Sequence, residues 1–393
     1  MTAQLSVRVV RDDREFESLR ETWDGLLQKS ADNHIYLTYE WLFTWWQHYS
    51  EGRKLNILLV EDEGTVLGIV PLMESTYGKG PLKFRVLETI AAPDCDYGGA
   101  ILTERQEEAV DALLAHLEAR LKGGRFLRLP QVPQESQFLG LVKRRLAALP
   151  AKLVWHERVQ TTCPYIALPA TWQEYLGTLR RKRRGNLRRA LESLKREHQV
   201  EFRESAAGDS LAEPVAELFE LQRKRWHSLN LRKGMYSDPR ARAFYLDAAR
   251  ALGERGWLCL SMLSVDGRAA SAVYGLRYGQ RFYYTVTAFD PDCAEYSIGH
   301  LHIQYLVEKA IADGLKEFDF LIGDEPYKRL WGRSSRNNVE LLMVRHGLLS
   351  GLRLRLFPLT MRLGHILRRG LRENFYLFRL QRREARQKRE EGG

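Results

Sequence analysis

Paired cysteines and long apolar runs are both missing from this chain of 393 residues. The four cysteines, Cys95, Cys163, Cys259 and Cys293, are scattered and form no C-x-x-C pair. The sequence therefore predicts neither a disulfide-stapled fold nor a structural zinc site. No apolar run reaches the ~18–20 residues that span a bilayer, and the N-terminus has no signal-peptide pattern. We expect a cytoplasmic protein.

The motifs of several enzyme classes are missing as well. There is no G-x-S-x-G nucleophile elbow and no Walker motif. The ten histidines show no metal-ligand spacing, so no bound metal is expected, and no sequence-specific DNA-binding motif is visible. What is present, 44% hydrophobic and 28% charged residues, is typical of a globular protein with two or three domains.

Positive charge is concentrated in two segments of the chain. The net charge is +11. Residues 180–196 carry nine Lys or Arg and one acid, and residues 345–393 carry thirteen and four. Subtracting these segments, at +8 and +9, leaves the rest of the chain at −6. The excess is local, which indicates an anionic partner met at particular places rather than a generally basic protein.

The first basic segment has an apolar stripe. Over residues 176–194, one helical face carries Leu176, Leu179, Leu187, Leu191 and Leu194. One interpretation is a basic amphipathic helix packed on a sheet. The other is an electrostatic clamp for an anionic acceptor such as a lipid-pyrophosphate sugar, a nucleotide sugar or tRNA. The clamp residues would be Arg181, Arg184 and Arg188.

The second basic segment predicts a helix over residues 361–389 with leucine and phenylalanine on one side and arginine on the other. Such helices lie on anionic membranes. They would hold the protein peripherally on the inner face of the cell membrane. The alternative is a helix docked on the body of the protein.

Two patterns occur twice in the sequence, about 190 to 200 residues apart. The segments ILLVEDEGTVLGIVPL and LSMLSVDGRAASAVYGL both indicate strand, turn and strand. The segments EARLKGGRFLRL and EKAIADGLKEFDFL both indicate helix, glycine stop and strand. We predict an α+β fold of two tandem units with mixed sheets, residues 1–150 and 151–345, followed by the basic tail 346–393. Chance recurrence is the alternative.

Residues 282–331 contain the candidate chemistry. A strand leads through a loop into a helix that begins near Ser297 and Gly299. A helix N-terminus binds pyrophosphate well, although Ser and Gly also occur there for capping alone.

A polar cluster follows the next strand, FDFLIG. Asp324, Glu325, Tyr327 and Lys328 lie within five residues, with Trp331 just beyond. A carboxylate can take a proton from an amine or hydroxyl, and a phenol can donate one to a leaving group. A solvated turn with a local salt bridge is the alternative interpretation.

These stretches, with RRKRRGNLRRALESL and LQRKRWHSLN, resemble the CelD/BcsL-type acyltransferases of the GNAT superfamily. That family is associated with bacterial cellulose and exopolysaccharide biosynthesis and is related to the FemAB aminoacyl transferases. The resemblance is clearest over residues 170–331. It implies a tandem, FemAB-like GNAT fold, metal-free transfer and an acyl-CoA donor, acetyl-CoA above all. The implied CoA-binding residues are Tyr296, Ser297, Ile298, Gly299 and His300, although the usual Q/R-x-x-G-x-G/A loop is absent.

The resemblance also assigns roles to the polar cluster. Asp324 or Glu325 would be the base, Tyr327 the acid and Lys328 a phosphate or oxyanion partner, with His300 or His302 as alternative bases. Further candidate substrate-binding residues are Asp96, Tyr97, Arg225, Trp226 and Trp331. Asp96 and Tyr97 can equally form a turn before Gly98. Trp41, Trp45 and Trp46 could stack on sugars, but a helical aromatic stripe favours core packing.

The leading hypothesis is acyl transfer from acyl-CoA to an amine or hydroxyl of a cell-envelope or exopolysaccharide precursor. Two alternatives stay open. One is a FemAB-like transferase that uses aminoacyl-tRNA and binds it through the basic segments. The other is a non-catalytic, GNAT-like subunit of a polysaccharide synthase.

Overall fold

The computed structural model describes residues 4–78, 83–92, 94–148, 152–205, 210–228, 238–347, 350–352, 354, 356 and 357. The chain divides into two compact units. Unit 1 comprises residues up to Asn33, Ser50–Gln160 and the chain from Asn337, and unit 2 comprises His34–Tyr49 and Thr161–Arg336. This division does not coincide with the predicted boundaries at 150/151 and 345/346. Strands β9 (Leu153–Ala167) and β15 (Ser334–Arg345) each run through a boundary. The predicted helix over 361–389 lies outside the described residues.

Unit 1 contains two sheets. The strands of the smaller sheet, β1 (Ser6–Val10), β3 (Ile57–Asp62), β4 (Thr65–Val70) and β7 (Ile101–Leu102), pair in the order β1-β3-β4-β7. The larger sheet has the order β9-β15-β8-β6-β5-β2. Its other strands are β2 (Lys54–Leu55), β5 (Leu72–Tyr77), β6 (Phe84–Thr89) and β8 (Phe126–Pro133).

The helices of unit 1 are α1 (Asp13–Ser18), α2 (Arg20–Lys29), α4 (Gln106–Arg120) and α5 (Gln137–Ala148). The side chain of Asp12 starts α1 by accepting from two backbone N–H groups of its first turn. Leucine and valine side chains of α4 and α5 form the main apolar core with those of β3, β4, β8 and β15.

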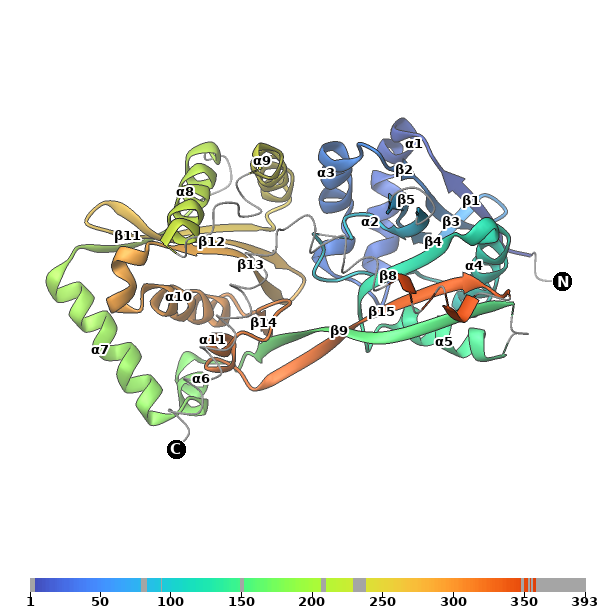
Figure 1. Ribbon diagram of the computed structural model, residues 1–393. Coiled ribbons are helices and arrows are strands. Elements are labelled where there is room, and N and C mark those ends of the chain that lie inside the picture. Colours follow the sequence, from blue (N-terminus) through green and yellow to red (C-terminus); the bar gives the residue numbers. More distant parts are fainter. Residues whose placement is uncertain are drawn as a thin grey trace. The chain divides into compact units, whose positions relative to one another are not determined.

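Unit 2 is one sheet with helices on both faces (Figure 1). Its strand order is β10-β11-β12-β13-β14-β9. The strands are β10 (Val200–Glu204), β11 (Leu258–Val265), β12 (Arg268–Tyr278), β13 (Arg281–Phe289) and β14 (Glu317–Asp319). Helices α8 (Ala212–Ser228) and α9 (Pro239–Glu254) cover one face, and α10 (Ile298–Ala312) lies on the other. The remaining helices are α3 (Tyr39–Tyr49), α6 (Trp172–Thr178), α7 (Arg181–Glu197) and α11 (Pro326–Arg329).

The tryptophans of α3 are core residues, as predicted. Trp41, Trp45 and Trp46 are all buried. The Trp41 ring meets Phe244 of α9 edge-on, with the ring centroids 5.2 Å apart. Aromatic pairs in this arrangement add to the free energy of burial, so the stripe holds α3 in unit 2.

The same order of elements occurs in both units. In unit 1, the β5–β6 hairpin is followed by α4 and by β8, which is parallel to β6. In unit 2, the β12–β13 hairpin is followed by α10 and by β14, which is parallel to β13. The predicted tandem α+β units with mixed sheets are confirmed.

The basic helix predicted over 176–194 is two helices rather than one. Helix α6 ends at Thr178, Leu179 has extended backbone, and α7 begins at Arg181. The guanidinium of Arg184 donates to the carbonyls of Leu176 and Leu179 at 2.9 and 2.8 Å. Because the last carbonyls of a helix have no partner within the helix, this arginine stabilises the break.

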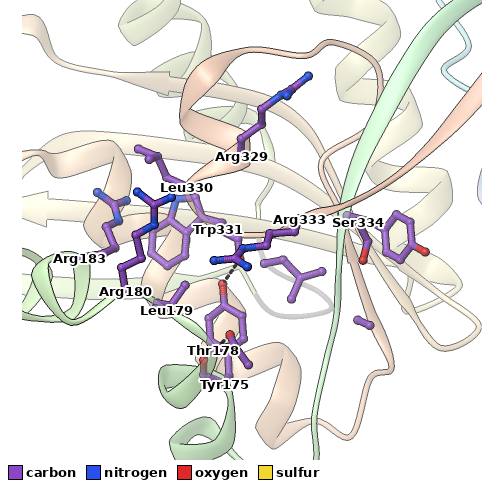
Figure 2. A pocket seen from close by; sticks show the side chains of 14 residues that line it. Tyr175, Thr178, Leu179, Arg180, Arg183, Arg329, Leu330, Trp331, Arg333 and Ser334 are labelled. Atoms are coloured by element: carbon purple, nitrogen blue, oxygen red, sulfur yellow. Dashed lines mark hydrogen bonds between the residues drawn. The ribbon is translucent and has the colours of Figure 1, made fainter. Parts of the chain in front are cut away.

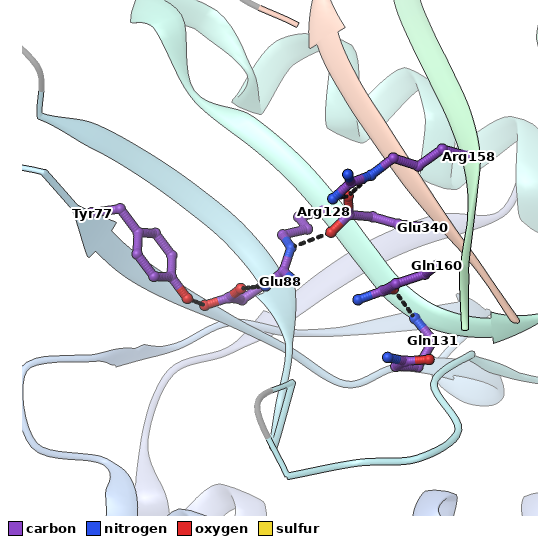
Figure 3. Close-up of polar contacts among 7 residues, drawn as sticks. All are labelled: Tyr77, Glu88, Arg128, Gln131, Arg158, Gln160 and Glu340. Carbon is purple, nitrogen blue, oxygen red and sulfur yellow. Dashed lines mark hydrogen bonds and ion pairs between the residues drawn. The ribbon is translucent and has the colours of Figure 1, made fainter. Parts of the chain in front are cut away.

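A cluster of ionic and polar side chains connects five strands of the larger sheet in unit 1 (Figure 3). Arg128 of β8 lies between two carboxylates, 2.9 Å from Glu88 of β6 and 2.7 Å from Glu340 of β15. Glu340 also binds Arg158 of β9, and Tyr77 of β5 donates to Glu88 at 2.5 Å. Neither carboxylate has more than 2% of its side chain exposed, so each depends on these partners for compensation.

Replacing Arg128 with Met should therefore destabilise the protein strongly. Two buried carboxylates would lose their shared cation, which typically costs about 3–5 kcal/mol of unfolding free energy. Urea denaturation followed by fluorescence measures this. The control is Arg145→Met, which removes a partly exposed pair with Asp111 and should cost about 0–1 kcal/mol. Equal effects of the two substitutions would contradict the assignment.

Candidate active site in the second unit

Strands β13 and β14 pair over only three residues each. After Asp319 the chain leaves β13 and follows β9, where the N–H of Phe320 donates to the carbonyl of Pro164 at 3.0 Å. Strand β13 continues to Phe289 without a described strand on that side. Two parallel strands that part in this way leave an edge along which an extended ligand can lie. The carbonyl of Thr287 in this stretch already accepts from Nε2 of Gln222 at 2.5 Å.

A pocket of about 330 Å³ opens beside this free stretch of β13, at the N-terminus of α10. We call it the α10 pocket. It is lined by Arg225, Tyr284, Thr287, Phe289, Ala294, Ser297, Ile298, Gly299, His300, Ile303 and Tyr327. Its volume suits a small molecule or the reactive end of a larger one. Sequence analysis selected six of these residues, from α8, α10 and α11.

The imidazole of His300 is held in one tautomer. Its Nδ1 accepts hydrogen bonds from Nη2 of Arg183 at 2.8 Å and from Nε1 of Trp331 at 3.2 Å. Guanidinium and indole nitrogens only donate, so Nδ1 is the acceptor and carries no proton. Burial and the charge of Arg183 lower the pKa of His300 to about 4. At neutral pH the ring is therefore neutral, with its proton on Nε2, which has no partner among the described residues.

Two consequences follow for the roles predicted for histidine. His300 is a poor general base, because its Nδ1 is occupied and its Nε2 already carries a proton. His302 is fully buried, lies 2.9 Å from the hydroxyls of both Ser261 and Ser271, and has its pKa lowered by burial to about 3. It is a structural residue of α10.

Tyr327 brings a second neutral donor to the same pocket. Burial, followed by the nearby Tyr284 and Glu325, raises the pKa of its phenol well above the usual value. Its hydroxyl makes no hydrogen bond to any described residue. The His300 and Tyr327 rings lie 6.4 Å apart, centroid to centroid. A carbonyl oxygen entering the pocket would thus meet an N–H and an O–H donor.

Arg225 supplies the positive charge of the α10 pocket. Its guanidinium lies over the ring of Phe289, 4.5 Å from the centroid, and faces the start of α10 within the same pocket. With the positive end of the helix dipole, it makes this pocket suitable for a phosphate or carboxylate group. The residues present therefore fit the acyl end of an acyl-CoA, with a positive charge close to its carbonyl oxygen.

The predicted carboxylates do not line the α10 pocket. Asp324 is ion-paired with Arg329 at the surface. Glu325 lies 2.9 Å from Lys328, half exposed. The Lys328 ammonium is buried and donates to the carbonyl of Ile322 at 2.7 Å. The solvated turn with local salt bridges therefore describes this segment, and only its Tyr327 reaches the pocket.

The predicted start of α10 needs one correction. Ser297 stands at the N-cap position but has left-handed backbone, with φ +54°, and its side chain makes no capping hydrogen bond. The hydroxyl of Tyr296 is bonded to Glu197 at 2.9 Å, and this residue does not line the pocket. A Cβ on Gly299 would meet Phe289 at an ordinary 3.5 Å, so glycine is not required there.

The three predicted clamp arginines do not line the α10 pocket. Arg184 stabilises the end of α6, as described above. Arg188 is exposed and lies 3.6 Å from Glu192. Arg181 is exposed and lines neither pocket of unit 2 described here.

The other candidate substrate-binding residues have mainly structural contacts. Trp226 donates to Gln222 within α8 at 3.0 Å. Asp96 and Tyr97 belong to unit 1, where the carbonyl of Asp96 accepts from Asn338 at 2.8 Å and Tyr97 is buried. Trp331 is also buried, and its carbonyl accepts the hydroxyl of Tyr175 at 2.6 Å.

A second pocket, of about 410 Å³ (Figure 2), is bordered by Arg183 and Trp331, the two residues that donate to His300. We call it the arginine pocket. It is lined by Tyr165, Ile166, Ala167, Tyr175, Thr178, Leu179, Arg180, Arg183, Arg329, Leu330, Trp331, Gly332, Arg333 and Ser334. Sequence analysis missed Arg180 and Arg183. The helical spacing could have indicated Arg183, because this residue precedes the buried Leu187 by one helical turn and so shares its inward face.

The comparisons with known proteins support a GNAT-type transferase fold. Residues 181–329 match the model of the GNAT acetyltransferase domain, which indicates a transferase. No curated protein matches the chain significantly. Within the described residues, no three or more His, Cys, Asp or Glu side chains gather as metal ligands, and none of the helices is long and apolar enough to cross a bilayer.

Solved structures share the fold at low identity. FemX has a TM-score of 0.60 and 14% identity, over 83% of this chain and 96% of that chain. L-PGS from Bacillus licheniformis has a TM-score of 0.54 and 13% identity, over 88% of this chain and 96% of that chain. A conserved protein of unknown function from Bacteroides thetaiotaomicron VPI-5482 has a TM-score of 0.55 and 13% identity, over 86% of this chain and 100% of that chain. The predicted tandem, FemAB-like GNAT fold is confirmed, and the CelD/BcsL subtype stays a prediction.

The low pKa of His300 can be tested directly. Replacing Arg183 with Gln removes an adjacent positive charge, so the pKa of His300 should rise from about 4 towards, without reaching, its ordinary value, because burial remains. Histidine-selective NMR titration measures this. Arg188→Gln, on the exposed face of the same helix, should leave the resonance unchanged. An unshifted pKa in the Arg183 variant would refute the contact.

Proposed function

We propose that the chain is an acyltransferase that moves an acyl group, in the first place acetyl, from acyl-CoA to an amine or hydroxyl of an anionic cell-envelope or exopolysaccharide precursor. One observation carries the proposal. The α10 pocket presents the neutral donors His300 Nε2 and Tyr327 Oη beside the free stretch of β13 and the start of α10.

The binding part of the proposal follows from the shape of the ligand. An acyl-pantetheine arm is extended and carries amide groups, which suit the open edge of β13. The α10 pocket receives the thioester end, where the guanidinium of Arg225 and the N-terminal turn of α10 add positive potential.

The catalytic part follows from the two donors. When the acceptor nitrogen or oxygen attacks the thioester carbon, negative charge develops on the carbonyl oxygen. Donors already in place stabilise that charge without reorganising. The C–S bond then breaks, and Tyr327, which keeps its proton at neutral pH, can protonate the leaving thiolate.

The proton of the acceptor needs a separate path. Glu325 remains our candidate base, because it is half exposed and close enough to affect the pKa of Tyr327. Both acids are ion-paired, Asp324 with Arg329 and Glu325 with Lys328, but Asp324 is less suitable because it does not contribute to the pKa shift of Tyr327. Neither residue lines the α10 pocket, so the proton transfer would occur at its mouth.

Tyr327→Phe tests the proposed chemistry. Loss of one oxyanion donor typically lowers kcat by about 10²–10³-fold, whereas acyl-CoA binding should persist. Release of free thiol measures transfer, and the thermal shift caused by acetyl-CoA and longer acyl-CoA thioesters measures binding.

Tyr305→Phe is the matched control, because this tyrosine lies on α10, outside the pocket, and stacks on Phe202. Unchanged turnover in Tyr327→Phe would remove this residue from the mechanism. The absence of any thermal shift with acyl-CoA would overturn the donor and favour a non-catalytic, GNAT-like subunit.

One observation favours aminoacyl-tRNA as the alternative donor. The outer face of α7 exposes several cations, among them Arg181, Lys182 and Arg188, and such a row suits an RNA backbone.

The two donors predict different responses to RNase and salt. For acyl-CoA, transfer should be unaffected by RNase, and replacing Arg181 and Arg188 with Gln should change turnover less than twofold. An RNase-sensitive reaction that weakens steeply with salt would establish the tRNA donor instead.

A further inference from the structure

The arginine pocket carries positive charge without compensation. Its lining contains four arginines and no Asp or Glu. Arg329 is paired with Asp324. Within the part of the chain that the structure describes, Arg180, Arg183 and Arg333 form no ion pair with a carboxylate. Elsewhere on the surface, Arg145, Arg223 and Arg250 each pair with a carboxylate.

Arg183 is held in a defined position. Its Nη2 donates to His300 at 2.8 Å, and its guanidinium lies 4.9 Å from the ring centroid of Trp331. Its Nε is buried and has no hydrogen-bond partner among the described residues. A guanidinium whose rotamer is already ordered loses little entropy when it binds a ligand, so this donor is prepared for an oxygen anion.

The backbone adds to the positive potential of this pocket. Arg180 is the N-cap of α7, a helix of 17 residues, and no side chain caps its first turn. The pocket therefore receives the positive end of a long helix as well as three guanidinium groups. Figure 2 shows the side chains of Arg180, Arg183 and Arg333 around the same opening.

We propose that the arginine pocket binds a diphosphate group of a small ligand. A single carboxylate would leave most of the three charges unmatched, whereas a diphosphate has enough charge and several oxygens for bidentate guanidinium contacts. Both a nucleotide-linked and a lipid-linked sugar contain this group. That such a ligand is the acceptor rests on the proposed function, but the binding itself does not.

The contact between Arg183 and His300 links the two pockets. An anion bound to Arg183 offsets the charge that helps to keep His300 neutral, so the pKa of His300 should rise when the arginine pocket is filled. This resonance therefore distinguishes binding here from binding elsewhere on the basic surface.

The test measures inorganic pyrophosphate binding by calorimetry and by the NMR titration of His300. The full chain is compared with two double variants of equal charge change. Arg180→Gln with Arg333→Gln should weaken pyrophosphate binding at least about tenfold, as expected for the loss of charge-assisted hydrogen bonds. Arg188→Gln with Arg196→Gln, on the exposed face of α7 and paired with acids, should change it less than twofold.

Three further ligands identify the source of the group. A nucleoside diphosphate that binds more tightly than pyrophosphate, or an isoprenyl diphosphate that does so, supports the proposal and identifies the carrier. The proposal is overturned if both double variants weaken binding equally, or if pyrophosphate binds without shifting His300. It is also overturned if only an RNA oligonucleotide binds with this dependence on Arg180 and Arg333. None of these readouts requires acyl transfer, so the proposal can fail independently of the proposed function.

Discussion

The active unit depends on where β13 and β14 part. The two parallel strands hold together for three pairs, and after Asp319 the chain keeps its hydrogen bonds to β9 but not those to β13. A continuous parallel pair would fill the space in front of α10 with backbone. Because the pair ends early, β13 keeps an open edge, and α11 can bring Tyr327 to the helix start. The pocket is thus a consequence of strand pairing, and the side chains that line it determine its chemistry.

A single nitrogen atom organises the side chains around that opening. Nδ1 of His300 is shared by Arg183 of α7 and Trp331, which follows α11. Three elements, one of them more than a hundred residues from the other two, therefore meet at one imidazole. The contact decides the tautomer of the ring and holds both the guanidinium that faces the neighbouring pocket and the buried indole.

Much of the fold could be predicted from local patterns, because α4, α8, α9, α10 and the hairpins are built on their own periodicity. The missed elements depend on distant partners. Helix α5 receives its cap from Asp32, which accepts from the N–H of Phe138 at 2.8 Å. Strand β15 places the carboxylate of Glu340 in the core, where its burial is compensated by ion pairs with Arg128 and Arg158. No window of sequence contains both members of these pairs.

The site was predictable to a similar extent. The sequence indicated the start of α10 and the segment around Tyr327, because strand ends and helix starts are local features. It could not show which carboxylates form ion pairs with arginines. Asp324 was therefore predicted as a base although it is paired with Arg329. The leucine stripe of α7 is confirmed, since Leu187 and Leu194 are buried. The break at Leu179 was not predicted, nor was the inward position of Arg183, whereas Arg188 lies outside.

The placement of β15 has a consequence for how the protein is made. This strand lies between β9 and β8 in the larger sheet of unit 1, yet it ends at Arg345, nearly two hundred residues after the rest of that sheet has left the ribosome. Until then, the growing chain lacks Glu340, the buried carboxylate that Arg128 and Arg158 share. The strands of unit 2 are all present earlier, since β9 precedes them and β14 ends at Asp319. The part of the protein that contains the pockets is therefore complete in the growing chain before the part that begins the sequence.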